Sequence, residues 1–216
     1  MIKLDYFDLI SRRPIEIENV GSIRCPLLSD IDNIKYYTYC SYIQVLKITP
    51  DDFFDNLEEK YGIKVPVDQI AEITKFDLII SDGSLLQEIV DAFNFFFVEE
   101  VYFDPGQMVF AVCTINDCKE ENIVGYVSRD NYSDIVNIIL QRINIEVDEN
   151  DVDDLSKVKS KRGRKIFEKI REGRKKMKKA KEQAEGGKHQ SMANIISSVA
   201  AFCPNMNYIQ IWDLTV

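Results

Sequence analysis

The stretch SLLQEIVDAFNFFF, residues 84–97, decides the fold because it is the most strongly core-seeking segment of the sequence. Its apolar side chains recur at helical spacing, at positions 85, 86, 89, 90, 93, 96 and 97. This spacing places them on one face of a helix, and such a face has to be buried against other elements. We therefore predict a helix here whose apolar face lies in the protein core.

A hairpin and a helix are expected closer to the N-terminus. Residues 15–25, IEIENVGSIRC, alternate apolar and polar side chains around Asn19–Gly21, which is typical of a small β-hairpin. After this hairpin, Ser29 or Asp30 can cap a helix that runs to about Lys47.

A second helix is expected to begin at Thr49-Pro50, where a capping side chain precedes a proline at the first helical position. The helix then runs through DDFFDNLEEKY and ends at Gly62. Asp51, Asp52 and Asp55 lie in its first turns, where the helix dipole stabilises negative charge. We interpret them as helix-start residues and not as a metal site.

The remaining elements of the body alternate between helix and strand. A short helix is predicted over 68–80 and strands over 98–104, 108–115 and 122–128, with a turn at Pro105-Gly106. A last body helix is predicted from Asp130 or Asn131 to about Arg142. The sequence therefore predicts an α+β fold, with an antiparallel sheet of about four to six strands packed by about five helices.

The charge is divided unevenly along the chain. Residues 157–188 hold 15 of the 27 Lys and Arg residues and only four acids, a net charge of +11. The other 184 residues hold 12 basic and 32 acidic side chains, a net charge of −20. We predict an acidic α+β body over 1–146, an acidic linker over 147–159, and a basic helical hairpin with a C-terminal apolar segment over 160–216.

The basic segment also carries an apolar pattern. Ile166, Ile170, Gly173, Met177, Ala180 and Ala184 recur at spacings of three and four, and Phe167 widens this seam at its start. A seam of this kind needs a partner helix. The apolar segment 192–203 can fold back on it after Gly186-Gly187, which gives the predicted hairpin.

Three interpretations of the basic segment compete. In the first, the basic side chains form the solvent-exposed face of a helical hairpin that lies on the acidic body. In the second they bind a partner protein, and in the third residues 161–181 bind nucleic acid. A nucleic-acid surface is the third choice, because the segment lacks the interleaved aromatic residues of a stacking platform. The candidate partner-binding residues are Arg162, Arg164, Ile166, Phe167, Ile170, Lys175, Lys176 and Met177, together with Tyr208, Ile211 and Trp212 near the C-terminus.

Composition and motifs exclude several functions. The sequence pI of about 4.8 argues against general affinity for nucleic acid. The five cysteines have neither zinc nor redox spacing, and the only histidine, His189, cannot build a His-based triad. Phosphate-loop and nucleophile-elbow motifs are missing, as are a signal peptide and a membrane-spanning run. We expect a cytoplasmic protein with no catalytic residue, metal or cofactor.

The layout of the chain resembles a family of phage and prophage proteins from Gram-positive hosts that are described as tail assembly chaperone-like. The resemblance covers most of the chain and rests on stretches of similar pattern. These are DYFDLIS (5–11), VGSIRCPLLSDI (20–31), NYSDIVNIILQR (131–142), KIFEKIREGRKK (165–176) and NIISSVAAF with NYIQIWDLT (194–215). Family members continue beyond the WDLT segment, whereas this sequence ends at Val216. We expect this end to be packed on the body or on a partner, or else to be a shortened version of a longer binding surface.

The resemblance implies a binding protein and not an enzyme. Tail assembly chaperones bind the tape measure protein before the tail tube assembles, and they help to recruit tube subunits. The implied partners are phage tape measure and tail tube proteins in the host cytoplasm, with no membrane, and the sequence also allows a homo-oligomer. The alternative is a nucleic-acid-associated regulator that uses the basic helix 161–181. A hydrolase would need convergent carboxylates in a pocket, and the sequence contains no pattern for one.

Overall fold

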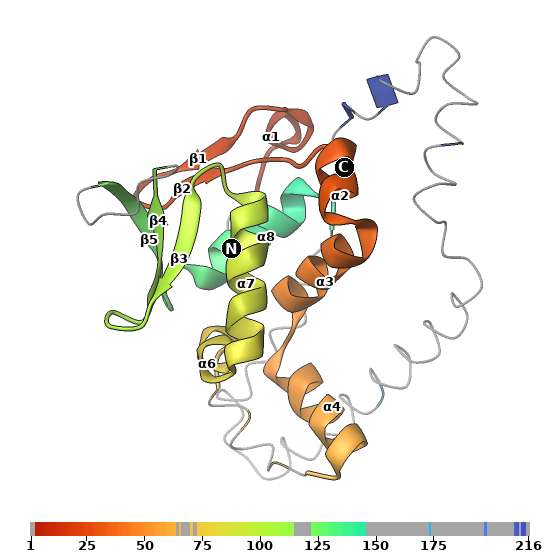
Figure 1. Ribbon diagram of the computed structural model, residues 1–216, viewed down its shortest axis with the longest axis vertical. Helices are drawn as coiled ribbons and strands as arrows, with labels where there is room; N and C mark the ends of the chain where they lie inside the picture. Colours follow the sequence, from red (N-terminus) through yellow and green to blue (C-terminus); the bar gives the residue numbers. More distant parts are fainter. Residues whose placement is uncertain are drawn as a thin grey trace. The chain divides into compact units, whose positions relative to one another are not determined.

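The computed structural model describes residues 3–63, 65, 70, 73–114, 122–145, 173, 197, 210–211 and 213–214. The chain divides into two compact units, residues 1–149 with 212–216 and residues 150–211. Most of the described residues lie in the first unit. Its seven described helices and two small antiparallel sheets confirm the predicted α+β class (Figure 1).

The central helix forms where the sequence predicts it. Helix α7 (Gly83–Phe96) begins one residue before the predicted start, because Asp82 is its cap: the Asp82 side chain accepts from the backbone N–H groups of Ser84 and Leu85. The preceding helix α6 (Lys75–Ser81) begins at a Thr74 cap. The predicted helix over 68–80 is therefore interrupted just before residue 75, where Ile73 and Thr74 are not helical.

The predicted helix from residue 29 or 30 to Lys47 is two helices. Helix α2 (Leu28–Ile34) and helix α3 (Tyr36–Lys47) are separated by Lys35, whose φ of 74° is left-handed and ends α2. Asp30 is not the cap of α2 but lies in its first turn, where its carboxylate accepts from the N–H of Leu27. The apolar periodicity continues across the break, which is why the sequence does not reveal it.

The other helices lie close to their predicted positions. Helix α4 (Pro50–Tyr61) ends at Gly62, which is left-handed, and helix α8 (Tyr132–Arg142) follows Asn131. A short helix, α1 (Tyr6–Ile10), precedes the hairpin, and the Asp5 side chain caps it by accepting from the N–H of Asp8.

Five described strands form two sheets and not one. Strands β1 (Ile15–Ile17) and β2 (Gly21–Ile23) form the predicted N-terminal hairpin. Strands β3 (Glu100–Asp104), β4 (Val109–Cys113) and β5 (Ile123–Val127) form an antiparallel sheet in chain order, with Phe103 opposite Phe110 and Phe110 opposite Val127.

The hairpin is bonded to the segment just before β3 and to strand β5 of the three-stranded sheet. On one side Ile23 forms a bridge with Phe97, and the N–H of Val98 donates to the Ser22 carbonyl. On the other side the N–H of Tyr126 in β5 donates to the carbonyl of Asn19 in the hairpin turn, at 3.0 Å. The hairpin is therefore bonded both to the segment just before β3 and to the outer edge of β5.

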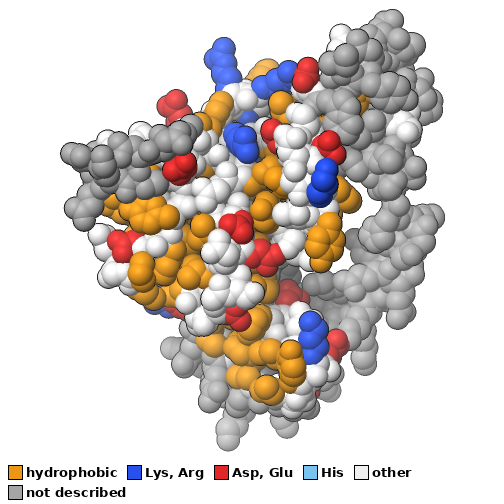
Figure 2. Space-filling view, in the orientation of Figure 1, with side chains coloured by type: hydrophobic (Ala, Val, Ile, Leu, Met, Phe, Trp, Pro, Cys, Tyr) orange, Lys and Arg blue, Asp and Glu red, His pale blue; other side chains and the backbone are white. Residues whose placement is uncertain are grey.

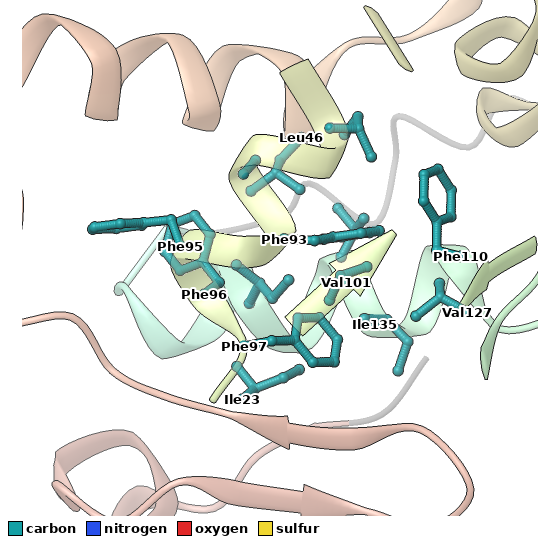
Figure 3. Packing of buried hydrophobic residues seen from close by; sticks show 14 of the residues in the cluster. Ile23, Leu46, Phe93, Phe95, Phe96, Phe97, Val101, Phe110, Val127 and Ile135 are labelled. Carbon is teal, nitrogen blue, oxygen red and sulfur yellow. The ribbon is translucent and has the colours of Figure 1, made fainter. Parts of the chain in front are cut away.

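The core lies between the three-stranded sheet and helices α7 and α8 (Figure 3). Its centre is a set of edge-to-face aromatic contacts, in which the Phe93 ring lies 5.3 Å from Phe110 and 5.6 Å from Phe97. Phe76 of α6 and Tyr132 of α8 extend this set, with ring centroids 5.7 Å apart. The side chains of residues 84–97 are thus at the middle of the core, as the sequence predicts.

The predicted C-terminal hairpin lies almost entirely outside the described residues and stays a prediction. The same holds for the acidic linker over 147–159. Leu214 is described, and its carbonyl accepts a hydrogen bond of 3.0 Å from the N–H of Leu28 at the start of α2. Residues 213–214 are therefore bonded to the body, in agreement with the expectation of a packed segment.

Candidate protein-binding site

The structure describes one of the predicted partner-binding residues. Ile211 is fully buried. The others, Arg162, Arg164, Ile166, Phe167, Ile170, Lys175, Lys176, Met177, Tyr208 and Trp212, lie outside the described residues. Within the basic seam, Gly173 is described: it is helical and exposed, and no atom lies within 4 Å of the place that a Cβ would take there.

The most prominent candidate site in the described body is helix α4. Its N-terminus is fixed by Thr49, whose hydroxyl accepts from the N–H of Asp52 at 3.1 Å. Pro50 occupies the first helical position, where the missing N–H costs nothing. At the other end the N–H of Gly62 donates to the Glu58 carbonyl, and Gly62 takes the left-handed conformation that closes a helix. Local capping therefore defines both ends of α4.

The apolar face of α4 is only partly covered: Phe53, Phe54 and Leu57 are half-buried. Phe53, Phe54, Leu57 and Tyr61 fall on one side of the helix, because they are spaced by one, three and four residues. All twelve residues of α4 are described, and none of them is buried. The Phe53 and Phe54 rings pack edge to face at 5.4 Å, and Tyr61 is 70% exposed. Hydrophobic side chains reach the surface in the lower part of Figure 2, where Figure 1 places α4.

The polar residues of α4 are strongly acidic. Its sequence contains Asp51, Asp52, Asp55, Glu58 and Glu59 against Lys60, a net charge of −4. Glu58 borders the aromatic stripe, whereas Glu59 lies on the far side, because each residue turns the helix by about 100°. An amphipathic helix with this combination docks through its apolar face, and its charge selects positively charged partners.

Two smaller aromatic surfaces are also exposed. On α1 the adjacent Tyr6 and Phe7 side chains are 70% and 74% exposed, with ring centroids 6.0 Å apart. On α3 Tyr37 is 85% exposed, next to Tyr36. The hydrogen bond to Cys40, together with partial burial, raises the pKa of Tyr36 above its usual value. Tyr36 therefore stays neutral at physiological pH and adds apolar area without charge.

One charged side chain is buried in the body. Arg142, at the end of α8, is fully buried, and its guanidinium donates to the backbone carbonyls of Asp8 and Arg13. Beside it, the Gln141 side chain accepts from the N–H of Leu4. The N-terminal segment is therefore attached to α8 through polar bonds, which positions α1 and its exposed aromatic pair. The periodicity of residues 131–142 gives no sign of this role.

Neither a metal site nor a membrane span is found in the part of the chain that the structure describes. Within it, histidine, cysteine and acidic side chains do not form a group of three that could hold a metal ion. Among the same residues, no helix is both long enough and apolar enough to cross a bilayer. The described cysteines Cys25, Cys40 and Cys113 are free thiols.

The sequence predicts helix α4 and explains its acidic residues as helix-start residues, but its apolar stripe was not recognised as a candidate site. The stripe of Phe53, Phe54, Leu57 and Tyr61 is visible as helical periodicity. Such a stripe usually faces the core of its own protein. Only the tertiary structure shows that the core is completed without it.

Comparisons with known proteins give no relative: the chain matches no family model, no curated protein and no solved structure.

Proposed function

We propose that this protein is a phage tail morphogenesis factor, a tail assembly chaperone that binds the tape measure protein in the host cytoplasm. It acts by binding and not by catalysis. The proposal starts from the resemblance of residues 5–11, 20–31, 131–142, 165–176 and 194–215 to the tail assembly chaperone-like family. The observation that supports it in the structure is the partly exposed aromatic stripe of α4.

A chaperone of this kind needs a surface that stays soluble and still offers apolar contacts to a client. Helix α4 meets both requirements, because Phe53, Phe54 and Leu57 are partly exposed while the surrounding acids keep the helix hydrated. A tape measure protein is a long helical chain, and its apolar helices need cover before the tube forms around it. An amphipathic client helix can lie along α4 with its i, i+3, i+4 anchors against the stripe.

Co-expression with a helical fragment of a phage tape measure protein tests the proposal. We expect the two chains to co-purify. Replacing Phe53 by Ser removes one aromatic anchor, which costs about 2 kcal/mol of binding free energy, roughly thirtyfold in Kd. The matched control is Asn56→Ser, a change on the same helix but away from the stripe, which should leave the Kd unchanged.

Circular dichroism of both variants shows whether α4 and the body stay folded. If the two chains do not co-purify while both are soluble, the proposed partner is wrong. Salt-sensitive binding of the purified protein to duplex DNA or RNA, abolished by reversing Arg162, Arg164, Lys175 and Lys176, would instead support the nucleic-acid regulator.

A further inference from the structure

The break between helices α2 and α3 has no cause in the local sequence. Residues 28–47 contain neither glycine nor proline, and a single residue, Lys35, separates the two helices. Lys35 stands at the start of α3, and among the described residues its side chain makes no capping hydrogen bond there. Glycine, proline and capping side chains are the usual signals for ending one helix and starting another. The break therefore has to be imposed by the tertiary structure.

The backbone of Lys35 is strained. Its φ is 74° and its ψ is 140°, whereas the left-handed helical region that L-residues can reach has a ψ of about 30–60°. The observed pair of angles lies close to a region that only glycine takes freely. A residue keeps such a conformation only where the surrounding structure holds it.

The apolar side chains would fit one continuous helix equally well. Each residue turns a helix by about 100°, so the apolar positions of a helix over 28–47 would share an arc of about 140°. In the structure these side chains are buried or packed against the core: Ile31, Ile34, Tyr39, Tyr42, Val45 and Leu46. Burial of these residues therefore does not require the break.

The break also leaves backbone donors without helical partners. Within the described residues, the N–H groups of residues 36–38 have no backbone acceptor. The first bonded N–H of α3 is that of Tyr39, which donates to the Lys35 carbonyl at 3.1 Å. In a continuous helix the N–H groups of residues 36–38 would donate to the carbonyls of residues 32–34. Joining the helices would thus add hydrogen bonds and relieve the strain.

We propose that α2 and α3 are two halves of one helix that the fold holds broken, with residues 213–214 as the latch. The N–H of Leu28, in the first turn of α2, donates to the Leu214 carbonyl at 3.0 Å. When this bond opens, Lys35 can enter the right-handed region and the helix can run from 28 to 47. Anything that draws residues 213–214 away from α2 favours this joined form. The inference goes beyond the proposed function, because it needs no client.

Lys35→Gly and Lys35→Ala in the full-length protein test the strain. Both changes remove the lysine side chain, but glycine takes the observed φ freely, whereas alanine keeps the strain and favours a helix. NMR relaxation dispersion at the amides of residues 36–38 measures the share of the joined form. The ratio of joined to broken form should be at least about tenfold higher in Lys35→Ala than in Lys35→Gly.

Leu28→Pro and Leu28→Ala in the full-length protein test the latch. Both lose the leucine side chain, but only proline removes the N–H that donates to Leu214. Proline is tolerated at the first helical position, which Leu28 occupies, so α2 itself should persist. The ratio of joined to broken form should be about fivefold higher in Leu28→Pro than in Leu28→Ala, the effect of one hydrogen bond.

The double variant Leu28→Pro, Lys35→Ala should contain the largest share of the joined form. Its amides at residues 36–38 should also exchange hydrogen more slowly than in the wild type, because the carbonyls of residues 32–34 now accept from them. The amide of Phe97, bonded to Phe93 in the core, is the control and should be unchanged in every variant.

Three results would overturn the inference. The first is the same ratio in Lys35→Gly and Lys35→Ala, and the second is the absence of a second form at residues 36–38 in every variant, the double variant included. The third is a change at Phe97 that matches the change at residues 36–38, because the whole body would then be opening. Equal ratios in Leu28→Pro and Leu28→Ala would overturn the role of residues 213–214. All measurements use the protein without a tape measure fragment, so they are independent of the test of the proposed function.

Discussion

A Cβ atom on Gly125 would lie 2.1 Å from the backbone carbonyl oxygen of Asn19. Gly125 lies at the centre of β5, and Asn19 lies in the turn of the N-terminal hairpin, more than a hundred residues earlier. The N–H of the next residue, Tyr126, donates to the same oxygen. This close approach lets the hairpin reach the edge of β5 and satisfies a strand edge that would otherwise be open.

Gly125→Ala should therefore destabilise the body. The methyl group meets backbone atoms and not a flexible side chain, so the hairpin turn has to move away. Overpacking of this kind costs about 1–3 kcal/mol in the free energy of unfolding, which urea denaturation can measure. Gly83→Ala is the control, because no atom lies within 4 Å of its Cβ position, and its stability should be unchanged or slightly higher. Equal losses in the two variants would contradict the close approach.

Arg142→Met should loosen the N-terminal segment. The change keeps an apolar stem but removes the donors that bond the carbonyls of Asp8 and Arg13, and these carbonyls lose their partners. We expect a loss of at least about 2 kcal/mol in the free energy of unfolding and faster proteolysis before residue 14.

The control for this change is Arg129→Met, which breaks a salt bridge to Asp77 whose arginine is 59% exposed. An exposed ion pair of this kind contributes less than about 1 kcal/mol. If Arg142→Met cost no more than this control, the polar attachment of the N-terminal segment would be wrong.

Tyr132→Phe should leave the protein equally stable or make it more stable at pH 7. The hydroxyl of Tyr132 is buried, and it finds no hydrogen-bond partner among the described residues. Removing it takes away an unsatisfied polar group, which is worth up to about 1 kcal/mol. A clear loss of stability in urea denaturation would show that the hydroxyl has a partner after all.

The same tyrosine predicts how stability depends on alkaline pH. Burial raises the pKa of Tyr132, and it also raises the pKa of Tyr39, above the ordinary value of a tyrosine. Above pH 10 the unfolded chain therefore releases protons that the folded chain keeps. Stability should be constant below about pH 10 and fall above it, by about 1.4 kcal/mol per pH unit for each of the two groups. In Tyr132→Phe the fall should be less steep, while Tyr39 and the other tyrosines with a raised pKa still contribute; an unchanged slope would contradict the burial of this hydroxyl.

The hydrogen bond from Leu28 to Leu214 predicts the effect of removing residues 213–216. The N–H of Leu28 lies in the first turn of α2, where no helical carbonyl can accept it, and the Leu214 carbonyl takes that place. In the shortened chain the amide hydrogen of Leu28 should exchange faster and stability should fall by about 1 kcal/mol. The amide of Phe97, bonded to Phe93 inside the core, should exchange as before. Unchanged exchange at Leu28 would show that this bond does not form in solution.

Much of the local structure could be predicted from the sequence, because the signals for it are local. The periodicity of residues 84–97, the Thr49-Pro50 start and Gly62 end of α4, and the alternation around Asn19–Gly21 each depend on residues within one or two turns of one another. The split at Lys35 could not be predicted, since a left-handed lysine has no sequence signature and the apolar pattern runs through it. The candidate site was predicted only in part: the acids of α4 were interpreted as helix-start residues, and its exposed stripe was not recognised.

The sequence by itself determined the α+β class, the order of the body elements, the position of the core helix and the separation of charge between an acidic body and a basic segment. Capping, periodicity and composition are properties of neighbouring residues, so these features need no fold to define them. The tertiary structure alone decided that the hairpin bonds to β5 and to the segment before β3, that Arg142 is buried against backbone carbonyls, and that the stripe of α4 is not part of the core cluster. Each of these features depends on contacts between residues that are far apart in the sequence. Every residue has a backbone carbonyl that can accept a hydrogen bond, so the residue type does not reveal such a bond.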